Sequence, residues 1–449
     1  MFENILSTFS PWSLLSDLGI ICALLLIGKL LRAKVKFIQK LFIPPCVLAG
    51  FLGLAFGPNG LGWLPLSSQL STYAAILIAL VFGSIPLSSP KYNKKDIKER
   101  IGPMWIYSQF GMIFQWGIAG LFGILVLKFI WPQINTAFGI LLPTGFYGGY
   151  GTATAIGTAF DGLGWNEALS LGMTTATAGM VTSILGGLII LKRGIKRGHT
   201  NYVKDFKDLP QELRSGLLPP DKRESLGETT TSSMSIESLT YHISMLFIIA
   251  FGGYLISQGV KSFYPKLELP VFSCAFLVGL LLKTILDATK ASKYTCQKTV
   301  SSLGGMFTDL LVAFGIAAIR IEIVVKYALP LIVLIVCGIF FIYWYTFYFG
   351  KRLFKEDWFE KSIFCWGFLA GNMSSGIALL RIADPKMQSK ALDDYGMAYL
   401  TIAPIEILIV TFVPMLFING FGLWFSIGCI LISLLLLFVA KKLGWWYKK

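Results

Sequence analysis

The sequence carries little charge for its length. Only 14% of its 449 residues are Asp, Glu, Lys or Arg, whereas about 25% is usual in soluble globular domains. Histidine is scarcer still, with two residues, and the seven cysteines form no CxxC pair. These shortages exclude a soluble enzyme with a single core, a disulfide scaffold and a metal centre built from His or Cys ligands.

Apolar residues are abundant instead. They make up 55% of the chain, and the net charge of +15 comes from Lys and Arg in short segments between apolar runs. A nucleic-acid-binding protein would gather its basic residues on one surface. Apolar runs separated by basic loops are typical of a polytopic membrane protein, which needs about 20 apolar residues for each helical span.

Eleven apolar segments are predicted to span a membrane. They are 12–31, 41–57, 70–88, 103–127, 168–191, 239–259, 269–286, 303–319, 327–349, 396–418 and 419–440. Two further stretches, 137–160 and 363–380, are rich in Gly, Ser and Thr, and hydropathy alone does not decide whether they cross.

The charge of the loops decides between these possibilities, because Lys and Arg concentrate on the cytoplasmic side. Six segments carry four or five basic residues each: 32–40, 91–100, 192–197, 283–298, 351–361 and 441–449. All six are cytoplasmic only if 137–160 and 363–380 enter the membrane and return, the first from outside and the second from inside. The alternative is that both are ordinary Gly-rich helices packed on their neighbours.

Short identities indicate an internal repeat. Lys40-Leu41-Phe42-Ile43-Pro44 recurs as Lys266-Leu267-Glu268-Leu269-Pro270, and Gly145-Phe146 recurs as Gly367-Phe368. Each half then has four spans, a hairpin and a fifth span, and this odd number inverts the second half in the membrane. Inverted repeats with interrupted helices in matching places are typical of secondary transporters.

The predicted fold is therefore an all-α polytopic membrane protein with two inverted repeats and one extra helix. The first repeat covers 1–191, a cytoplasmic linker 192–238, the second repeat 239–418, and the extra helix with a basic C-terminus 419–449. The N-terminus is expected outside and the C-terminus in the cytoplasm.

The two Gly-rich stretches are the predicted binding elements. Glycines let the backbone approach a ligand and expose N–H groups that suit a carboxylate, while hydroxyls and amides add oxygen ligands. The candidate substrate-binding residues are Gly148, Gly149, Tyr150, Gly151 and Thr152 in the first stretch and Gly371, Asn372, Ser374 and Ser375 in the second. Thr152 and Thr154 are also candidate cation ligands.

Ionisable residues within spans are further candidates, because charge at membrane depth is costly. Asp309 and Glu406 are predicted ligands for sodium or a proton, since hard cations take carboxylate oxygens. Asp309 is equally consistent with an ion pair or with a position near the cytoplasmic end of its helix. Arg381 fits a bidentate clamp on a substrate carboxylate, and equally a cytoplasmic residue paired with Asp384.

A resemblance adds to these predictions. The segment Pro143–Phe160, followed by Leu163-Gly164-Trp165-Asn166-Glu167-Ala168 and Ala176-Thr177-Ala178-Gly179, resembles the bacterial sodium/glutamate symporter family. Phe42–Gly57, Leu269–Leu286 and Gly367–Ala378 are similar to further segments of that family. The resemblance excludes helix 419–440 and much of the linker, and this chain departs from the family's pattern at Tyr150 and at the end of the second hairpin.

The resemblance implies sodium-coupled uptake of an acidic amino acid, with sodium as the coupling ion and no organic cofactor. It also implies a homodimer in a bacterial cell membrane, and an elevator motion of a transport domain against a scaffold. It points to Gly148–Thr152, Gly371–Ser375 and Glu406 as binding positions. A proton-coupled carrier, a channel and a non-transporting sensor remain alternatives, whereas an enzyme would need a catalytic constellation that two histidines outside the hairpins do not supply.

Overall fold

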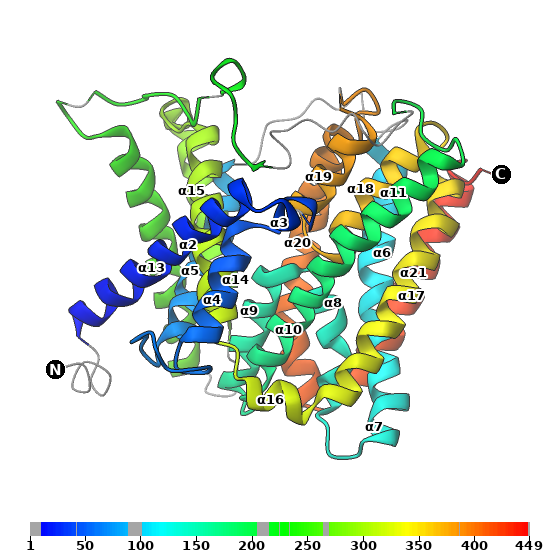
Figure 1. The fold of residues 1–449 in the computed structure, drawn as a ribbon, viewed down its shortest axis with the longest axis horizontal. Coiled ribbons are helices and arrows are strands. Elements are labelled where there is room, and N and C mark those ends of the chain that lie inside the picture. Colours follow the sequence, from blue (N-terminus) through cyan, green and yellow to red (C-terminus); the bar gives the residue numbers. More distant parts are fainter. Residues whose placement is uncertain are drawn as a thin grey trace. The chain divides into compact units, whose positions relative to one another are not determined.

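The computed structural model describes residues 10–41, 43–88, 101–203, 215–223, 225–232, 234–263, 269–385 and 387–447 (Figure 1). Every helix or strand assigned within these ranges is a helix. The basic loop 91–100, Phe42 and the repeat residues Lys266, Leu267 and Glu268 lie outside the described residues.

Ten helices in the described ranges are long and apolar enough to cross a membrane. They correspond to ten of the eleven predicted spans: 11–34, 70–88, 101–130, 168–196, 238–263, 271–288, 297–317, 328–353, 401–418 and 422–442. The prediction of an all-α polytopic membrane protein is therefore confirmed.

The remaining predicted span, 41–57, is a shorter helix. Its apolar part forms α4 (Pro45–Phe56), which has 12 residues and begins with a proline at its first position. At about 1.5 Å per residue, α4 is roughly 18 Å long, which is less than a full hydrocarbon core. The basic segment before it continues as the short helix α3 (Lys36–Leu41).

The chain divides into two compact units, and each draws helices from both halves of the sequence. Unit 1 comprises Met1–Lys91 and Ser215–Ile321, and unit 2 comprises Tyr92–Arg214 and Glu322–Lys449. The helices of unit 1 are α2 (Pro11–Lys34), α3, α4, α5 (Leu70–Ser88), α13 (Ser238–Phe263), α14 (Val271–Ala288) and α15 (Gln297–Ala317), with the short 3₁₀ turns Pro220–Lys222 and Ala291–Tyr294.

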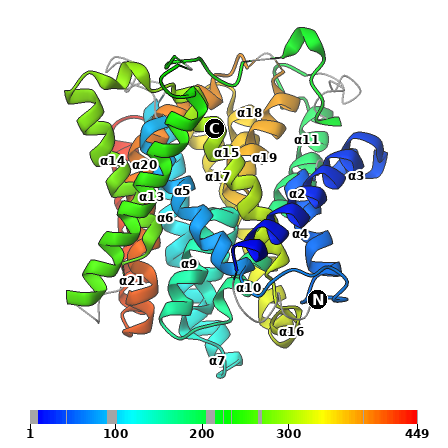
Figure 2. The same ribbon diagram turned by 90° about the vertical axis from the view of Figure 1, so that its left-hand side faces the viewer.

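Unit 1 is held together by close helix packing at small residues. Gly50 of α4 faces Ile316 of α15, where an added Cβ would lie 2.6 Å from the isoleucine Cβ. Helices α13 and α14 also pack against each other (Figure 2). Asp17 of α2 is buried, and its carboxylate accepts hydrogen bonds from the Ser67 backbone N–H at 2.9 Å and the Ser67 hydroxyl at 2.5 Å. Asp17 therefore links the segment before α5 to α2 by two hydrogen bonds.

Unit 2 contains both Gly-rich stretches. From its first segment come α6 (Ile101–Phe122), the π-helix η2 (Gly123–Leu127), α7 (Lys128–Ile130), the 3₁₀-helix η3 (Thr136–Ile140), α8 (Leu141–Gly145), α9 (Gly149–Gly162), α10 (Ala168–Val181), the π-helix η4 (Thr182–Gly186) and α11 (Gly187–Lys196). From its second come α16 (Ile321–Lys326, which starts at the boundary), α17 (Ala328–Leu353), α18 (Trp358–Ala370), α19 (Met373–Ala383), α20 (Ala391–Ile418) and α21 (Gly422–Lys442).

Both Gly-rich stretches are broken helices. The first, predicted over 137–160, consists of η3, α8 and α9 with a turn between Gly145 and Gly149. The second, predicted over 363–380, consists of α18 and α19 with a turn at Gly371 and Asn372. Interrupted helices at membrane depth occur where the freed backbone is buried in protein or lines a cavity.

Candidate functional site

The turn of the first broken helix depends on glycine. Gly149 has a φ of +61°, a left-handed conformation that glycine adopts without the steric cost of a Cβ. Gly148 packs directly against Thr152 one turn later, and an added Cβ would collide with that side chain. The chain can therefore stop α8 and start α9 within a few residues.

The turn of the second broken helix is capped by an amide. Asn372 is the N-cap of α19, and its side-chain oxygen accepts hydrogen bonds from the Ser375 backbone N–H at 2.8 Å and the Ser375 hydroxyl at 2.9 Å. An Asn at this position satisfies one of the N–H groups that a helix start leaves without a partner. The predicted polar residues Asn372 and Ser375 therefore bond to each other.

The two turns lie side by side within unit 2. An added Cβ at Gly149 would lie 2.9 Å from the Gly371 carbonyl oxygen and 3.7 Å from the Asn372 Cβ. The structure thus brings together the two candidate segments, which lie more than 200 positions apart in the sequence. It also places the first residues of α9 and α19 next to each other.

A π-helical segment supports the second turn. The Ser183 hydroxyl in η4 donates a hydrogen bond to the Gly367 carbonyl at 2.9 Å, and the Trp366 indole N–H donates one to the Ser183 carbonyl at 3.0 Å. An added Cβ at Gly371 would lie 2.7 Å from the Ser183 Cβ. A helix from the first half of the sequence therefore fixes the hairpin of the second half.

The other candidates of the first stretch are buried near its turn. The Tyr150 hydroxyl donates to the Thr177 hydroxyl at 3.2 Å, and the Thr154 hydroxyl donates to the Tyr150 carbonyl at 2.9 Å. Thr152 is 3% exposed and packs on Gly148. Thr152 consequently lies closer to the turn than Thr154, whose hydroxyl bonds back to its own helix.

Glu406 lies among tyrosines of the same unit. It is 8% exposed on α20, and the Tyr399 hydroxyl approaches its carboxyl closely enough to interact with it. Tyr395 and Tyr147 also lie within electrostatic range of that carboxyl. Because Tyr147 precedes Gly148 directly, Glu406 is linked to the first turn. Sequence reasoning missed all three tyrosines, since aromatic residues in apolar helices look like packing residues.

The remaining candidates lie elsewhere. Asp309 belongs to unit 1, where its carboxyl interacts with the Cys46 thiol. Arg381 is exposed in the last turn of α19, ten residues after Gly371, and no ion pair joins it to Asp384 in the described part of the chain. The side chain of Ser374 is outside the described residues.

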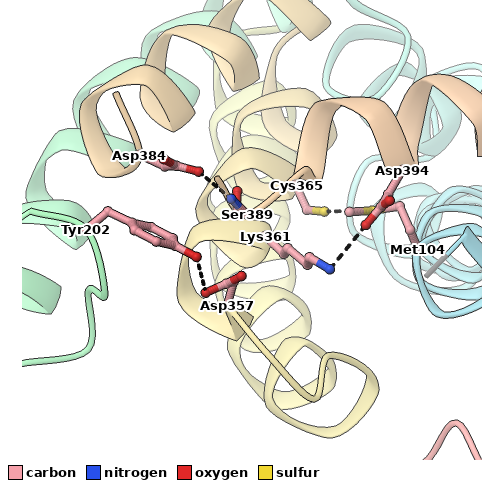
Figure 3. Close-up of polar contacts among 8 residues, drawn as sticks. All are labelled: Met104, Tyr202, Asp357, Lys361, Cys365, Asp384, Ser389 and Asp394. Carbon is pink, nitrogen blue, oxygen red and sulfur yellow. Dashed lines mark hydrogen bonds and ion pairs between the residues drawn. The ribbon is translucent and has the colours of Figure 1, made fainter. Parts of the chain in front are cut away.

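The base of the second hairpin holds a polar network that the sequence did not reveal (Figure 3). Asp357 accepts hydrogen bonds from the Tyr202 hydroxyl and the Asn201 side-chain amide, both at 2.9 Å. Burial, followed by the bond to Asp357, raises the pKa of Tyr202 to about 12. Lys361 of α18 pairs with the buried Asp394 of α20 at 3.2 Å. These contacts tie the base of α18 to residues 201–202 and to α20.

Two further carboxyls in this network are fully buried. Glu360 accepts a 2.6 Å hydrogen bond from the Asn201 backbone N–H, and Asp384 accepts one at 2.7 Å from the Ser389 backbone N–H. Burial raises the pKa of Glu360 above its usual value, although the bond from Asn201 opposes this effect. Across the described ranges, no group of three or more His, Cys, Asp or Glu side chains is arranged to hold a metal ion.

Comparison with known proteins identifies the family. The model of the sodium/glutamate symporter family matches residues 12–376. The chain belongs to the sodium/glutamate symporter family. It is 24% identical over 375 residues to the sodium/glutamate symporter of Escherichia coli (strain K12) and, to the same extent, to that of Shigella flexneri, covering 81% of this chain and 86% of each relative.

Membership of the sodium/glutamate symporter family implies a transporter, and the ten long apolar helices of the described ranges agree with a multi-pass membrane protein. The match includes both hairpin turns, from Gly148 and Gly149 to Gly371 and Asn372. It ends before Glu406 and before α21. Glu406 is therefore a candidate because of its surroundings in the structure, next to Tyr399 and Tyr395.

Proposed function

We propose that this protein is a symporter that uses a sodium gradient to carry glutamate, or a closely related acidic amino acid, across a bacterial cell membrane. The observation that carries the proposal is the contact between the two turns, with Gly149 next to Gly371 and Asn372 in one unit. The names of the relatives, sodium/glutamate symporter, support the choice of ion and substrate.

The ends of the broken helices carry partial charges that suit the two proposed ligands, glutamate and sodium. Helices α9 and α19 both begin at the turns, and a helix N-terminus carries a partial positive charge and N–H groups without an intrahelical partner. We assign the substrate carboxylates to these starts, at Gly148–Thr152 and Gly371–Ser375. Interrupted helices bind anionic substrates in the same manner in other transporter folds.

Sodium takes oxygen ligands, which the other ends of the broken helices provide. Helices α8 and α18 end at the same turns, and their last carbonyl groups lack intrahelical partners. We propose that these carbonyls and the Thr152 hydroxyl contact sodium. Thr154 and Asp309 are second candidates, because the first bonds to its own helix and the second belongs to unit 1.

Alternating access is proposed to follow the division into units. Unit 2 contains both turns, so it is the proposed transport domain, and unit 1 is the proposed scaffold of an elevator-type homodimer. Unit 1 draws α2, α4 and α5 from the first half of the sequence and α13, α14 and α15 from the second, as the predicted inverted repeat would require.

Transport into proteoliposomes tests the function. With an inward sodium gradient, labelled L-glutamate should accumulate with saturable kinetics, and potassium in place of sodium should abolish the accumulation. Preloaded unlabelled glutamate should accelerate entry by counterflow, as a carrier requires. Accumulation that is independent of sodium and depends on a pH gradient would identify a proton-coupled carrier. Non-saturable flux without counterflow would identify a channel.

A further inference from the structure

A carboxylate cage lies beside the two turns in unit 2. We define it as Glu406 together with Tyr147, Phe368, Tyr395 and Tyr399. The ring centroids of Phe368 and Tyr395 lie 4.4 Å apart, those of Tyr395 and Tyr399 5.7 Å, and those of Tyr147 and Phe368 6.4 Å. The cage therefore combines α20 with a residue from each hairpin.

The cage lacks a positive side chain. Within the described residues, burial and the Tyr399 hydroxyl act on the Glu406 carboxyl, and no Lys, Arg or His does. The charge of a buried carboxylate is costly unless a cation or several donors face it. The hydroxyl of Tyr147 is also buried, and it lies close enough to Tyr395 to interact with it.

The proposed reaction offers two cations, the sodium ion and the ammonium group of an amino acid. Sodium needs a shell of oxygen ligands, whereas the cage presents one carboxylate, phenol groups and ring faces. An organic ammonium group suits this lining, because its N–H groups bond to carboxylate and phenol oxygens while aromatic faces attract its charge. The composition of the cage thus favours the ammonium group.

We propose that the carboxylate cage binds the α-ammonium group of the substrate, with Glu406 as its counter-ion. The proposal rests on the function proposed above and refines it, since it assigns the residues that recognise the amino group of the acidic amino acid. The substrate's carboxylates lie at the starts of α9 and α19 and its ammonium group lies against α20. Glu406 is then a specificity-determining residue and not a sodium ligand.

The assignment of Glu406 to the ammonium group is tested by comparing two ligands in the wild-type protein and in Glu406→Gln. The two ligands are L-glutamate and glutarate, which has the same carbon chain without the amino group. Their apparent dissociation constants are measured on the purified full-length protein at saturating sodium, by ligand-dependent thermal stabilisation. In Glu406→Gln, the apparent dissociation constant of L-glutamate should rise by roughly tenfold or more, as expected when one member of a buried charge pair is removed. The dissociation constant of glutarate should stay unchanged or fall.

The ratio of the two constants is the decisive quantity, because a general loss of folding or of the carboxylate site changes both ligands alike. Glu360→Gln is the matched control, since it also removes a buried carboxyl of unit 2 but at the base of α18. It should leave the ratio at its wild-type value. Sodium half-saturation measured with glutarate should also stay unchanged in Glu406→Gln.

Three results would overturn the inference while leaving the proposed function in place. They are an unchanged ratio in Glu406→Gln, wild-type protein that binds both ligands equally, and a shift of sodium half-saturation with glutarate, which would make Glu406 a sodium ligand. Wild-type protein that binds neither ligand in sodium and does not transport L-glutamate would overturn both.

Discussion

At the residue scale, Gly149 meets two constraints at once. Its φ of +61° disfavours any side chain, and its α-carbon faces the Gly371 carbonyl so closely that a Cβ would lie 2.9 Å from that oxygen. A β-branched residue in this conformation is strained by roughly 1–3 kcal/mol before any contact is counted. Gly149→Val should therefore leave a protein that still inserts in membranes but lowers sodium-driven glutamate uptake by about 100-fold or more, a loss of roughly 2.7 kcal/mol.

A second glycine separates backbone strain from close approach. Gly164 has a φ of +89°, and no atom lies within 4 Å of its added Cβ. Gly164→Val should reduce thermal stability without blocking transport per folded molecule. Equal losses of transport in the two variants, each normalised to folded protein, would remove the argument that Gly149 lines the site.

Glu360 gives a prediction for pH. Its pKa in the folded protein is raised, mainly by burial, so between its usual value and the raised value the folded state binds more protons than the unfolded state. Stability should consequently fall as pH rises through that window. Glu360→Gln keeps an oxygen for the Asn201 N–H and removes the titration. Its melting temperature should depend less on pH across the acidic range, as differential scanning fluorimetry in detergent would measure; an unaltered slope would assign the dependence to other groups.

At the scale of elements, the sequence predicted the two broken helices because their glycines, serines and threonines interrupt otherwise apolar helical patterns. It could not predict which residues surround the turns. Glu406 and Asp309 carry the same signal, an acid within a span, yet they belong to different units. The tyrosines around Glu406 and the bond between Tyr202 and Asp357, which are 155 positions apart, depend on tertiary packing that has no local pattern.

The contact between the hairpin turns can be tested by cross-linking. The added Cβ of residue 149 lies 3.7 Å from that of Asn372, within the range of about 3.5–4.5 Å that disulfides need. Gly149→Cys combined with Asn372→Cys should form a disulfide on mild oxidation, detected by mass spectrometry in a background where the exposed Cys22 and Cys337 are replaced. The control pair Gly164→Cys with Asn372→Cys should not react, and a lack of cross-linking in both pairs would argue against adjacent turns.

At the scale of the whole molecule, the repeat and the compact units divide the chain differently. Each predicted repeat occupies one half of the sequence, whereas each unit combines segments of both halves. Residues 192–238 therefore join two repeats while their ends belong to different units. The proposed movement of unit 2 against unit 1 therefore involves a chain that passes between the units three times.

The topology depends on the short helix α4. Ten full-length helices alone would place both termini on one side of the membrane, so the predicted topology needs α4 as an eleventh crossing. If α4 did not cross, the five basic residues of 91–100 would lie opposite the four of 32–40, against the positive-inside rule. We therefore predict that the segment 58–69 is outside and that the central linker is cytoplasmic, with Met1 outside and Lys449 inside.

Thiol labelling in right-side-out vesicles tests on which side of the membrane the segment 58–69 and the central linker lie. Ser68 and Ser225 are exposed positions in 58–69 and in the linker, and each is changed to Cys in a background without other reactive cysteines. A membrane-impermeant maleimide should label Ser68→Cys in intact vesicles and Ser225→Cys only after permeabilisation. If α4 does not cross while Met1 is outside, the labelling reverses: 58–69 stays with 32–40 in the cytoplasm, and the three spans 70–88, 101–130 and 168–196 then carry the linker outside. The ten remaining crossings would then place the termini on the same side, and the inverted relation between the two halves would fail with them, since it requires an odd number of spans in each repeat.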